Sequence, residues 1–508
     1  MKRYITKIVL PLGILLFGAC SNFDELNDNP DKAGVVTPSL ILTETEKSTF
    51  RFWNPNASDY SNACQLAAYT AVIQDSPMGN QYYFINPGGF DNFKKLTDLK
   101  KMVEFSAGKP EESSYKAFAL FYKAHIGFYY SLDFGDIPYS ETGKLDEGIM
   151  FPKYDKQEAV FDQVLADLKE AEELFAEGKK FEGDFMFDGD PDKWRRLCNA
   201  MQLKVLQTQS KKATQEDKAR FAEIVQSGNL MRGVEDNFQL TYTKNRSAKH
   251  PFFEGDYKQP NVVVSKMVVD LLKKWKDRRL FYFADPAAAL INSGMSESDF
   301  EAYEGAPTEG DFELLKSEKL NGKYSLINNR YTKIIDGDPR IWFSYAEQCF
   351  IIAEAIETGW IDGNSEEYYK NGVRAMLTYY MNGSSDNASY VHGMPITQEY
   401  IDGYFNGDNA YPSNTEERLH LIWEQRWMID FFQATEMRNY YQLLRTGYPK
   451  LPLDPNTSMN QDNKNDYPKR LKYPLVDQQT NLENLQKAID EQYGGVDNSM
   501  GVPWYLKD

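Results

Sequence analysis

Apolar residues recur along this chain at steps of three and four, the period of an amphipathic α-helix. Between Ser113 and Asp133 one helical face carries Tyr115, Phe118, Tyr122, Ile126 and Tyr129. Similar patterns predict helices from Pro38 past Ala71 and over residues 96–105, 155–175, 190–205, 265–276, 343–380 and 481–493. Asp155 and Asp190 are the expected N-caps of two of these helices. The chain is therefore expected to be mainly α-helical.

Residues 343–380 have the pattern of two helices joined near Gly359. Small residues on the first helix allow close packing, and the length is near that of a tetratricopeptide unit. The predicted fold class is thus a tetratricopeptide-like helix-pair scaffold with irregular ligand-binding loops. Helical repeat proteins often run to about this length as one unit, so residues 39–508 are expected to form a single domain.

The stretch from Ser413 to Leu453 is the most distinctive part of the chain, because it combines a wide aromatic helical face with charged residues. Trp423, Trp427 and Phe431 are expected to be core residues. Arg426, Asp430 and Arg438 are expected to be internal ion-pair partners. Asn414 or Thr415 can cap the helix, and Gly447 with Pro449 ends it. A structural role is therefore predicted for this stretch.

Two regions break the helical pattern. Residues 74–93 contain two prolines, three glycines and several aromatic side chains, and form a predicted aromatic loop. Residues 228–335 are irregular over much of their length, with Tyr303 and Tyr324 as weaker binding candidates. Long irregular segments in a compact domain are often functional, so ligand contacts are expected on such loops.

The N-terminus has the form of a bacterial lipoprotein signal. Lys2, Arg3 and Lys7 precede an apolar run that is too short to cross a bilayer as a mature helix. Small residues then precede Cys20, although Phe17 stands where Leu is usual. We expect residues 1–19 to be a signal peptide, Cys20 to be lipidated, and residues 20–38 to form a polar tether. An ordinary signal peptide is the alternative.

Charge and motif content exclude several functions. The net charge is −18, or −21 without Lys2, Arg3 and Lys7, so a nucleic-acid partner is not expected. No metal-binding histidine motif, phosphate-binding loop or nucleophile elbow occurs, so neither a cofactor nor a metal is expected. The three cysteines beyond Cys20 lie in apolar contexts and are interpreted as buried, unpaired residues. A catalytic pair of carboxylates stays open, because sequence cannot show their separation.

Several motifs occur in one order along the chain. They are D-F-G-D-I-P-Y-S-E (133–141), D-G-D-P-D-K-W-R-R-L-C-N-A-M-Q-L-K (188–204), S-Y-A-E-Q-C-F-I-I-A-E-A-I-E-T-G-W-I (344–361), the 413–453 block, and K-R-L-K-Y-P (469–474). In this order and spacing the chain resembles the SusD/RagB family of nutrient-binding outer-membrane lipoproteins. The resemblance covers essentially the whole mature chain. It departs from the family pattern at a few packing positions, such as Ala434 and Thr435.

The resemblance implies a lipid-anchored protein of the outer membrane that faces the cell exterior. It implies four tetratricopeptide-type helix pairs, and a position as a lid on a SusC-like TonB-dependent transporter. The expected ligand is a nutrient, most often a glycan and in some members a peptide, which is bound without catalysis. A surface glycan hydrolase and a purely structural surface protein are the alternatives from other functional classes.

The predicted ligand contacts lie in and just before the aromatic loop. Sugar rings stack their C–H faces on aromatic planes, while their hydroxyl groups need amide or carboxylate partners. The candidate ligand-binding residues are Trp53, Asn80, Tyr82, Tyr83, Phe84 and Asn86. Each of them could instead pack the loop on the scaffold. No residue-by-residue family motif carries these assignments, and Trp360, at a helix-pair turn, is expected to be structural.

Overall fold

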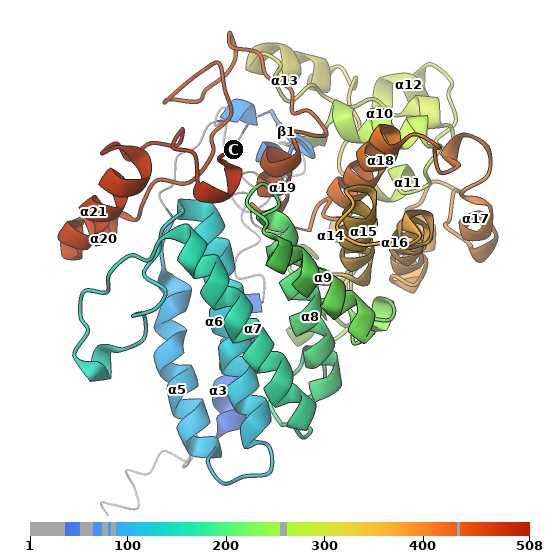
Figure 1. Cartoon of the computed structure of the whole chain (residues 1–508). Helices are drawn as coiled ribbons and strands as arrows, with labels where there is room; N and C mark the ends of the chain where they lie inside the picture. Colours follow the sequence, from blue (N-terminus) through green and yellow to red (C-terminus); the bar gives the residue numbers. More distant parts are fainter. Residues whose placement is uncertain (1–35, 51–63, 74–79, 83–87, 255–261, 434–436) are drawn as a thin grey trace, which may run out of the picture.

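The computed structural model describes residues 36–50, 64–73, 80–82, 88–254, 262–433 and 437–508, and it is mainly helical (Figure 1). The first group of helices is α3 (Pro38–Phe50), α5 (Lys95–Ser106), α6 (Glu112–Phe134), α7 (Gln157–Glu177), α8 (Pro191–Thr208) and α9 (Gln215–Ser227). The later helices are α10 (Lys266–Lys274), α11 (Leu280–Phe283), α12 (Ala288–Asn292), α13 (Phe312–Leu320), α14 (Arg330–Lys333), α15 (Tyr345–Glu357), α16 (Ser365–Met381), α17 (Gln398–Gly403), α18 (Thr415–Met428), α19 (Arg438–Thr446), α20 (Leu475–Thr480) and α21 (Leu482–Tyr493).

The first helices pack side by side, α3 against α5, then α5, α6, α7 and α8 in succession (Figure 1). Trp194 of α8 is fully buried at the centre of this group. Its indole ring packs against aromatic rings of α6, α7 and the strand at residue 238, namely Phe118, Phe121, Phe175 and Phe238. Asp190 caps α8 by accepting from Asp192 N and Lys193 N, as predicted. Aromatic packing thus holds these helices in one layer.

The second group of helices consists of α15, α16 and α18, and it joins the first group where α15 contacts α8. Gly372 of α16 lies directly on Phe350 of α15, where an added Cβ would be 2.7 Å from that ring. A larger residue would separate the two helices. The helix pair predicted over residues 343–380 is therefore confirmed, and close packing at Gly372 explains how the pair fits together.

Two short antiparallel sheets connect distant parts of the chain. Strand β1 (Thr70–Val72) pairs with β3 (Val262–Val264), and β2 (Phe238–Leu240) pairs with β4 (Arg340–Phe343). The prediction that the first helix continues past Ala71 is wrong, since residues 70–72 form β1. Its residues are fully buried on both faces, and such a strand has the same apolar run as a buried helix.

The Ser413–Leu453 stretch forms two helices rather than one. Asn414 caps α18 through Glu417 N, and Gly447, at φ 71°, caps α19, as expected. Between them Phe432 has φ 56° and packs its ring on Tyr331, with a centroid distance of 4.5 Å. That left-handed conformation is incompatible with a continuous helix. Tertiary packing of the aromatic rings therefore overrides the helical pattern here.

The predicted N-cap Asp155 is also wrong. Its carboxylate accepts hydrogen bonds from Ser140 N and Ser140 Oγ, at 2.6 and 2.9 Å. The residue before α7 is Lys156, which makes no side-chain cap. Instead Asp136 Oδ1 accepts from Gln157 N at 2.8 Å. The cap comes from a residue twenty-one positions upstream, a distance that no local cap pattern reveals.

Cys64, Cys198 and Cys349 are buried, as predicted, and no disulfide joins them to one another. Among the described residues, no helix is both long and apolar enough to span a membrane. Cys20 and the expected signal peptide lie outside the described residues.

Candidate functional site

The described parts of the predicted aromatic loop are the short 3₁₀ segment η1 (Asn80–Tyr82) and residues 88–93, which lead into the 3₁₀ segment η2 (Asp91–Lys94). Gln81 and Tyr82 have φ values of 52° and 64°, in the left-handed region that non-glycine residues rarely adopt. The Gln81 carbonyl accepts from Met459 N at 2.8 Å, and the Gln81 side-chain amide donates to the Gly310 carbonyl. Contacts with two distant segments therefore hold this strained backbone in place.

The segments around η1 also contact one another. Thr457 Oγ1 donates to the Glu309 carbonyl at 2.6 Å, and Tyr467 Oη donates to the Leu451 carbonyl at 2.7 Å. Residues 80–82, 309–310 and 451–459 therefore meet on one side of the scaffold. Asp454 and Glu309 are half-buried there, and Asn456 is exposed. These residues supply the carboxylate and amide groups that a sugar hydroxyl could use. No sequence motif marks the 451–459 segment as part of a site, because only the fold brings it to η1.

Tyr82 is placed inside this junction. Its side chain is 5% exposed, its Oη donates to the Pro452 carbonyl, and its ring lies edge-on to Tyr467 with a centroid distance of 5.2 Å. Burial raises the pKa of Tyr82 far above its ordinary value. The Tyr82 ring thus anchors η1, and in this conformation neither ring face is open to a ligand.

The other predicted contacts have different placements. Trp53, Tyr83, Phe84 and Asn86 lie outside the described residues. Asn80 forms the start of η1. The structure therefore brings Asn80 and Tyr82 to the junction with residues 309–310 and 451–459, and it does not place the remaining four.

The weaker aromatic candidates are interior residues. Tyr303 is fully buried, and its Oη donates to the Glu297 carbonyl at 2.8 Å. Tyr324 is 4% exposed and donates to the Glu318 carboxylate. Trp360 is half-buried against Phe221, with the ring centroids 5.6 Å apart, which agrees with a packing role. Neither tyrosine ring offers an open stacking surface.

A polar pocket of about 730 Å³ is lined by residues just before α12, by residues at α14 and by the turn at His392. His392 has φ 50°, and its ring lies between two carboxylates, with Nε2 3.2 Å from Asp285 Oδ1 and Nδ1 3.2 Å from Glu297 Oε2. Asp285 also accepts from Asn329 Nδ2 at 2.6 Å. Burial lowers the pKa of His392, but the two carboxylates outweigh it, and the pKa is raised overall. Sequence analysis did not identify this pocket.

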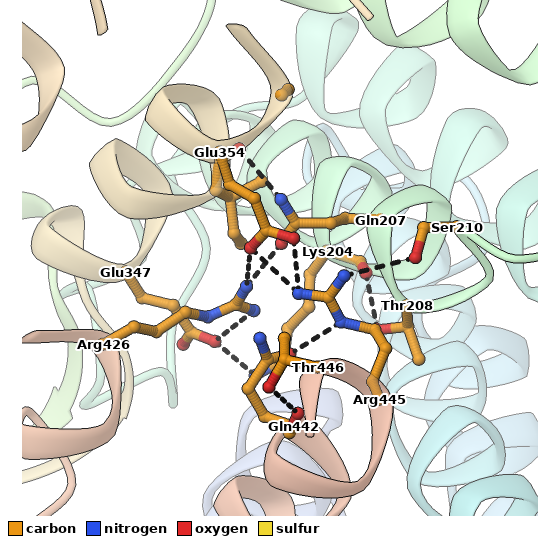
Figure 2. A network of polar contacts seen from close by, with 12 residues as sticks. Lys204, Gln207, Thr208, Ser210, Glu347, Glu354, Arg426, Gln442, Arg445 and Thr446 are labelled. Atoms are coloured by element: carbon orange, nitrogen blue, oxygen red, sulfur yellow. Dashed lines mark hydrogen bonds and ion pairs between the residues drawn. The ribbon is translucent and has the colours of Figure 1, made fainter. Parts of the chain in front are cut away.

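A buried network of charged side chains joins α8, α15, α18 and α19 (Figure 2). Glu347 binds Lys204 at 2.7 Å and Arg426 at 3.4 Å. Glu354 binds Arg445 at 2.7 Å and Arg426 at 3.6 Å. The prediction that Arg426 is an internal ion-pair partner is confirmed, while its acidic partners come from α15 rather than from its own stretch.

The other residues of that stretch are also inside the scaffold. Trp427 and Phe431 are core residues, as predicted, whereas Trp423 is only partly buried against the core. Arg438 donates to the carbonyl groups of Trp342 and Ile341. Burial raises the pKa of Asp430 to about 6, with Arg438 opposing the rise. Helices α18 and α19 of this stretch are therefore structural elements of the scaffold.

Within the described residues, no group of three or more His, Cys, Asp or Glu side chains is arranged to hold a metal ion. At His392, Nε2 faces Asp285 and Nδ1 faces Glu297. The two carboxylates therefore flank the imidazole ring and do not converge with it on one point, as metal ligands would. The η1 junction and the His392 pocket offer amide, carboxylate and imidazole groups for hydrogen bonding.

The family model for SusD-like proteins described as "Starch-binding associating with outer membrane" matches residues 30–474. The chain belongs to the SusD-like family. A comparison with curated proteins finds no match. SusD-like proteins bind nutrients at the outer membrane and are not catalysts, in agreement with the predicted family, fold and non-enzymatic function.

Solved structures agree with this SusD-like assignment. The chain is 35% identical to a SusD homolog of Bacteroides fragilis NCTC 9343, with a TM-score of 0.87, over 93% of this chain and 100% of that chain. It is 30% identical to a Bacteroides vulgatus ATCC 8482 outer-membrane protein connected with nutrient binding, with a TM-score of 0.82 and the same coverage. A chitin-binding SusD homolog of Flavobacterium johnsoniae shares 19% identity and a TM-score of 0.73, over 93% of this chain and 99% of that chain.

Proposed function

We propose that this SusD-like protein captures a glycan at the cell surface and passes it to a SusC-like TonB-dependent transporter. The observation that carries the proposal is the family match over residues 30–474, whose description names starch binding and the outer membrane. The chitin-binding homolog of F. johnsoniae has the same fold and also binds a polysaccharide. A glycan is therefore the ligand class that the relatives favour.

The proposed binding surface is the junction of η1 with residues 309–310 and 451–459. The Gln81 contacts fix the backbone of η1. The loop residues before and after η1 are therefore attached to a fixed segment. We assign ligand contacts to Trp53, Asn80, Tyr83, Phe84 and Asn86, with aromatic rings for stacking and amides for hydroxyl groups. Tyr82 has the supporting role of positioning the loop.

The lipid anchor and the transporter are further parts of the proposal. Cys20, after the signal-like residues 1–19, is the proposed acylation site, and residues 20–38 are the proposed tether. In this arrangement the scaffold is held at the outer membrane, where the transporter would receive the nutrient. Radiolabelled palmitate should label the wild-type chain in cells and leave the Cys20→Ala chain unlabelled.

A binding screen tests the ligand class. The chain with Cys20→Ala and without residues 1–19 is titrated with starch, chitin and other oligosaccharides and with peptides, by calorimetry. We expect saturable binding of an oligosaccharide and no new reducing ends after incubation. Binding of peptides alone would favour the peptide-binding alternative within the family. Release of reducing ends would instead favour a surface hydrolase.

Co-purification tests the transporter. A tagged chain expressed in its native host should bring down an outer-membrane barrel protein after mild detergent extraction. Recovery of the lipoprotein alone, with saturable glycan binding retained, would support a surface receptor that acts without a transporter.

A further inference from the structure

The loop between α6 and α7 lies beside α20 and α21, and the two parts form one apolar surface (Figure 1). Leu145 and Met150 of the loop are 66% and 68% exposed, and Leu475 and Val476 of α20 are 60% and 58% exposed. All four side chains line the same hollow, whose volume is about 770 Å³. We call this hollow with its four exposed residues the apolar groove. Exposed apolar side chains that gather at one place mark interaction sites, whereas single ones are ordinary.

The rest of the groove lining is also largely apolar. It includes Phe90, Pro138, Ile149, Pro152 and Pro474. Its charged residues are of both signs, namely Asp91, Lys94, Glu141, Lys144 and Asp477. Pro138 belongs to the 133–141 motif and Pro474 to the 469–474 motif, and neither motif takes part in the proposed ligand surface. The groove is therefore a distinct surface of mostly apolar character with a mixed charged margin.

Hydrogen bonds fasten the two sides of the apolar groove to each other. The side-chain amide of Asn481 donates to the Pro152 carbonyl at 2.8 Å, and that of Asn484 donates to the Phe151 carbonyl at 3.1 Å. Within the loop, the backbone amide of Ile149 donates to a backbone carbonyl at 3.2 Å. The exposed side chains are thus presented by backbone that is already in place. A fixed surface loses less conformational entropy when a partner binds, so it is suited to docking.

Neither a sugar nor a lipid surface fits the apolar groove well. None of its four exposed side chains is aromatic, so they offer a sugar ring no plane for stacking. Asp146 and Glu147 directly follow Leu145 in the chain, and Asp477 directly follows Val476. Insertion of the apolar side chains into a bilayer would therefore take carboxylates out of water, which is costly.

A second copy of the chain is also a poor occupant, because the groove is concave. A two-fold contact places the same surface of both copies against itself, so two hollows would face each other and their apolar walls would stay apart. A different protein with a projecting apolar segment fills such a hollow and covers the exposed side chains around it. The shape of the groove therefore favours a partner protein of another kind.

We propose that the apolar groove is the surface on which this chain docks to its transporter, and that it receives a projecting apolar segment of that protein. The inference rests on the proposed function, which brings the transporter against this chain at the outer membrane. The aromatic loop connects the two surfaces, since residues 80–82 belong to the proposed ligand surface and residues 88–91 line the groove. The transporter contact is thus separate from the ligand contacts of η1.

Quantitative co-purification tests the proposal with the full, tagged chain in its native host. The amount of TonB-dependent barrel protein recovered per chain is measured by mass spectrometry after mild detergent extraction. Met150→Ser and Leu475→Ser should each lower this recovery about tenfold, because an apolar side chain at the centre of an interface contributes much of its affinity. Leu320→Ser is the matched control, since Leu320 is 75% exposed at the end of α13 and does not line the groove.

The outcomes separate this inference from the proposed function. Recovery of the transporter by the wild-type chain and equally by both groove variants would overturn the docking surface and leave the proposed function standing. Recovery of no transporter by the wild-type chain would overturn the transporter as partner, and the docking surface with it. The groove variants should keep the Tm and the ligand affinity of the wild-type chain, because the substituted side chains are exposed and lie outside the ligand surface.

Photo-cross-linking gives a direct readout of the occupant. The photoreactive residue p-benzoylphenylalanine is placed at position 475 or, as the control, at position 320 of the full chain, and intact cells are irradiated. We expect a covalent adduct with the transporter from position 475 and none from position 320. An adduct of position 475 with a second copy of this chain, or with lipid in place of protein, would overturn the proposal and assign the groove to that occupant.

Discussion

The indole nitrogen of Trp194 donates a buried hydrogen bond to Asp184, with 2.7 Å between Nε1 and Oδ2. The same carboxylate accepts from the backbone amides of Met186, Phe187 and Gly189. The carboxylate thereby organises the loop before α8 and fastens it to the centre of the first helical layer. Its charge is satisfied entirely by neutral donors.

Trp194→Phe should destabilise the fold by about 1–3 kcal/mol beyond the loss of packing, because a donor to a buried carboxylate is removed. Urea unfolding followed by circular dichroism measures this change. Trp360→Phe is the control, since that half-buried ring packs on Phe221 and should cost much less. Equal losses in the two variants would show that the Asp184 hydrogen bond contributes little.

Glu46 of α3 gives a prediction about pH. Its carboxyl group is fully buried, and burial, with Asp184 nearby, raises its pKa well above the ordinary value. The folded state therefore binds a proton that the unfolded state releases, so Glu46 lowers stability as pH rises above its ordinary pKa near 4.5. Glu46→Gln should raise stability by at least about 1 kcal/mol at pH 8 and have little effect at pH 4.

Denaturant titrations of Glu46→Gln at the two pH values measure this difference. Glu44→Gln on the exposed side of the same helix is the matched control. A variant that is destabilised at pH 8 would mean that the Glu46 carboxyl is ionised and favourably bound in the folded protein.

Glu354 is predicted to be essential for the charge network. Glu354→Gln removes the carboxylate shared by Arg426 and Arg445, and leaves two buried cations with one fewer counter-charge. We expect a loss of about 3–5 kcal/mol in the free energy of unfolding. Glu112→Gln removes a solvent-accessible pair with Lys116 and should cost much less. Similar midpoints of chemical unfolding for both variants would contradict a structural role for the network.

His392 should give the opposite dependence on pH from Glu46. Its pKa is raised by Asp285 and Glu297 against the effect of burial, so the contacts of the protonated ring stabilise the fold most at low pH. This contribution is fully present below the ordinary pKa near 6.5 and is lost as pH rises through the folded value. His392→Gln should therefore lower the Tm more at pH 6 than at pH 9. A Tm difference that is the same at both pH values would contradict the charged state of the ring.

Variants of the aromatic loop separate ligand contact from support. Tyr83→Ala should weaken glycan binding by about 1–3 kcal/mol if its ring stacks on a sugar. Tyr82→Phe keeps the buried ring but removes the hydroxyl group that binds Pro452, so it should lower stability with a smaller effect on affinity. Phe151→Ala, at an exposed aromatic residue far from η1 in sequence, is the control. Unchanged affinity in Tyr83→Ala and Trp53→Ala would remove these residues from the site.

The sequence predicted those features that depend on local pattern. The Asp190 cap and the burial of Trp427 follow from residues within one or two helical turns of each other. Each helix of the α15–α16 pair likewise follows from its own local apolar pattern. The features that were missed depend on residues far apart in the chain. Phe432 leaves the helical conformation because its ring meets Tyr331, and α7 is capped from Asp136 rather than from Asp155.

In the candidate site, too, local features were predicted and long-range contacts were missed. An aromatic loop could be recognised from its composition, but the partners of η1 at residues 309–310 and 451–459 could not, since no local signal brings them together. Tyr82 was predicted to contact the ligand because the sequence does not reveal that Pro452 and Tyr467 bury its side chain. The pocket at His392 was missed because Asp285, Glu297 and His392 are spread over more than a hundred positions of the chain.

The segment from Cys64 to Ile73, which leads into the aromatic loop, makes several contacts with distant residues. β1 pairs with β3, Tyr69 stacks on Trp427 at 4.9 Å, and the Trp427 indole donates to the Ala67 carbonyl. Such long-range contacts form slowly, because the chain between them must first be brought together. During synthesis this segment can pair with β3 only after residue 264 has been made, and it meets Trp427 later still. Ligand recognition is therefore expected to be among the last properties that the folding chain acquires, and a ligand-competent molecule is one whose late helices are already in place.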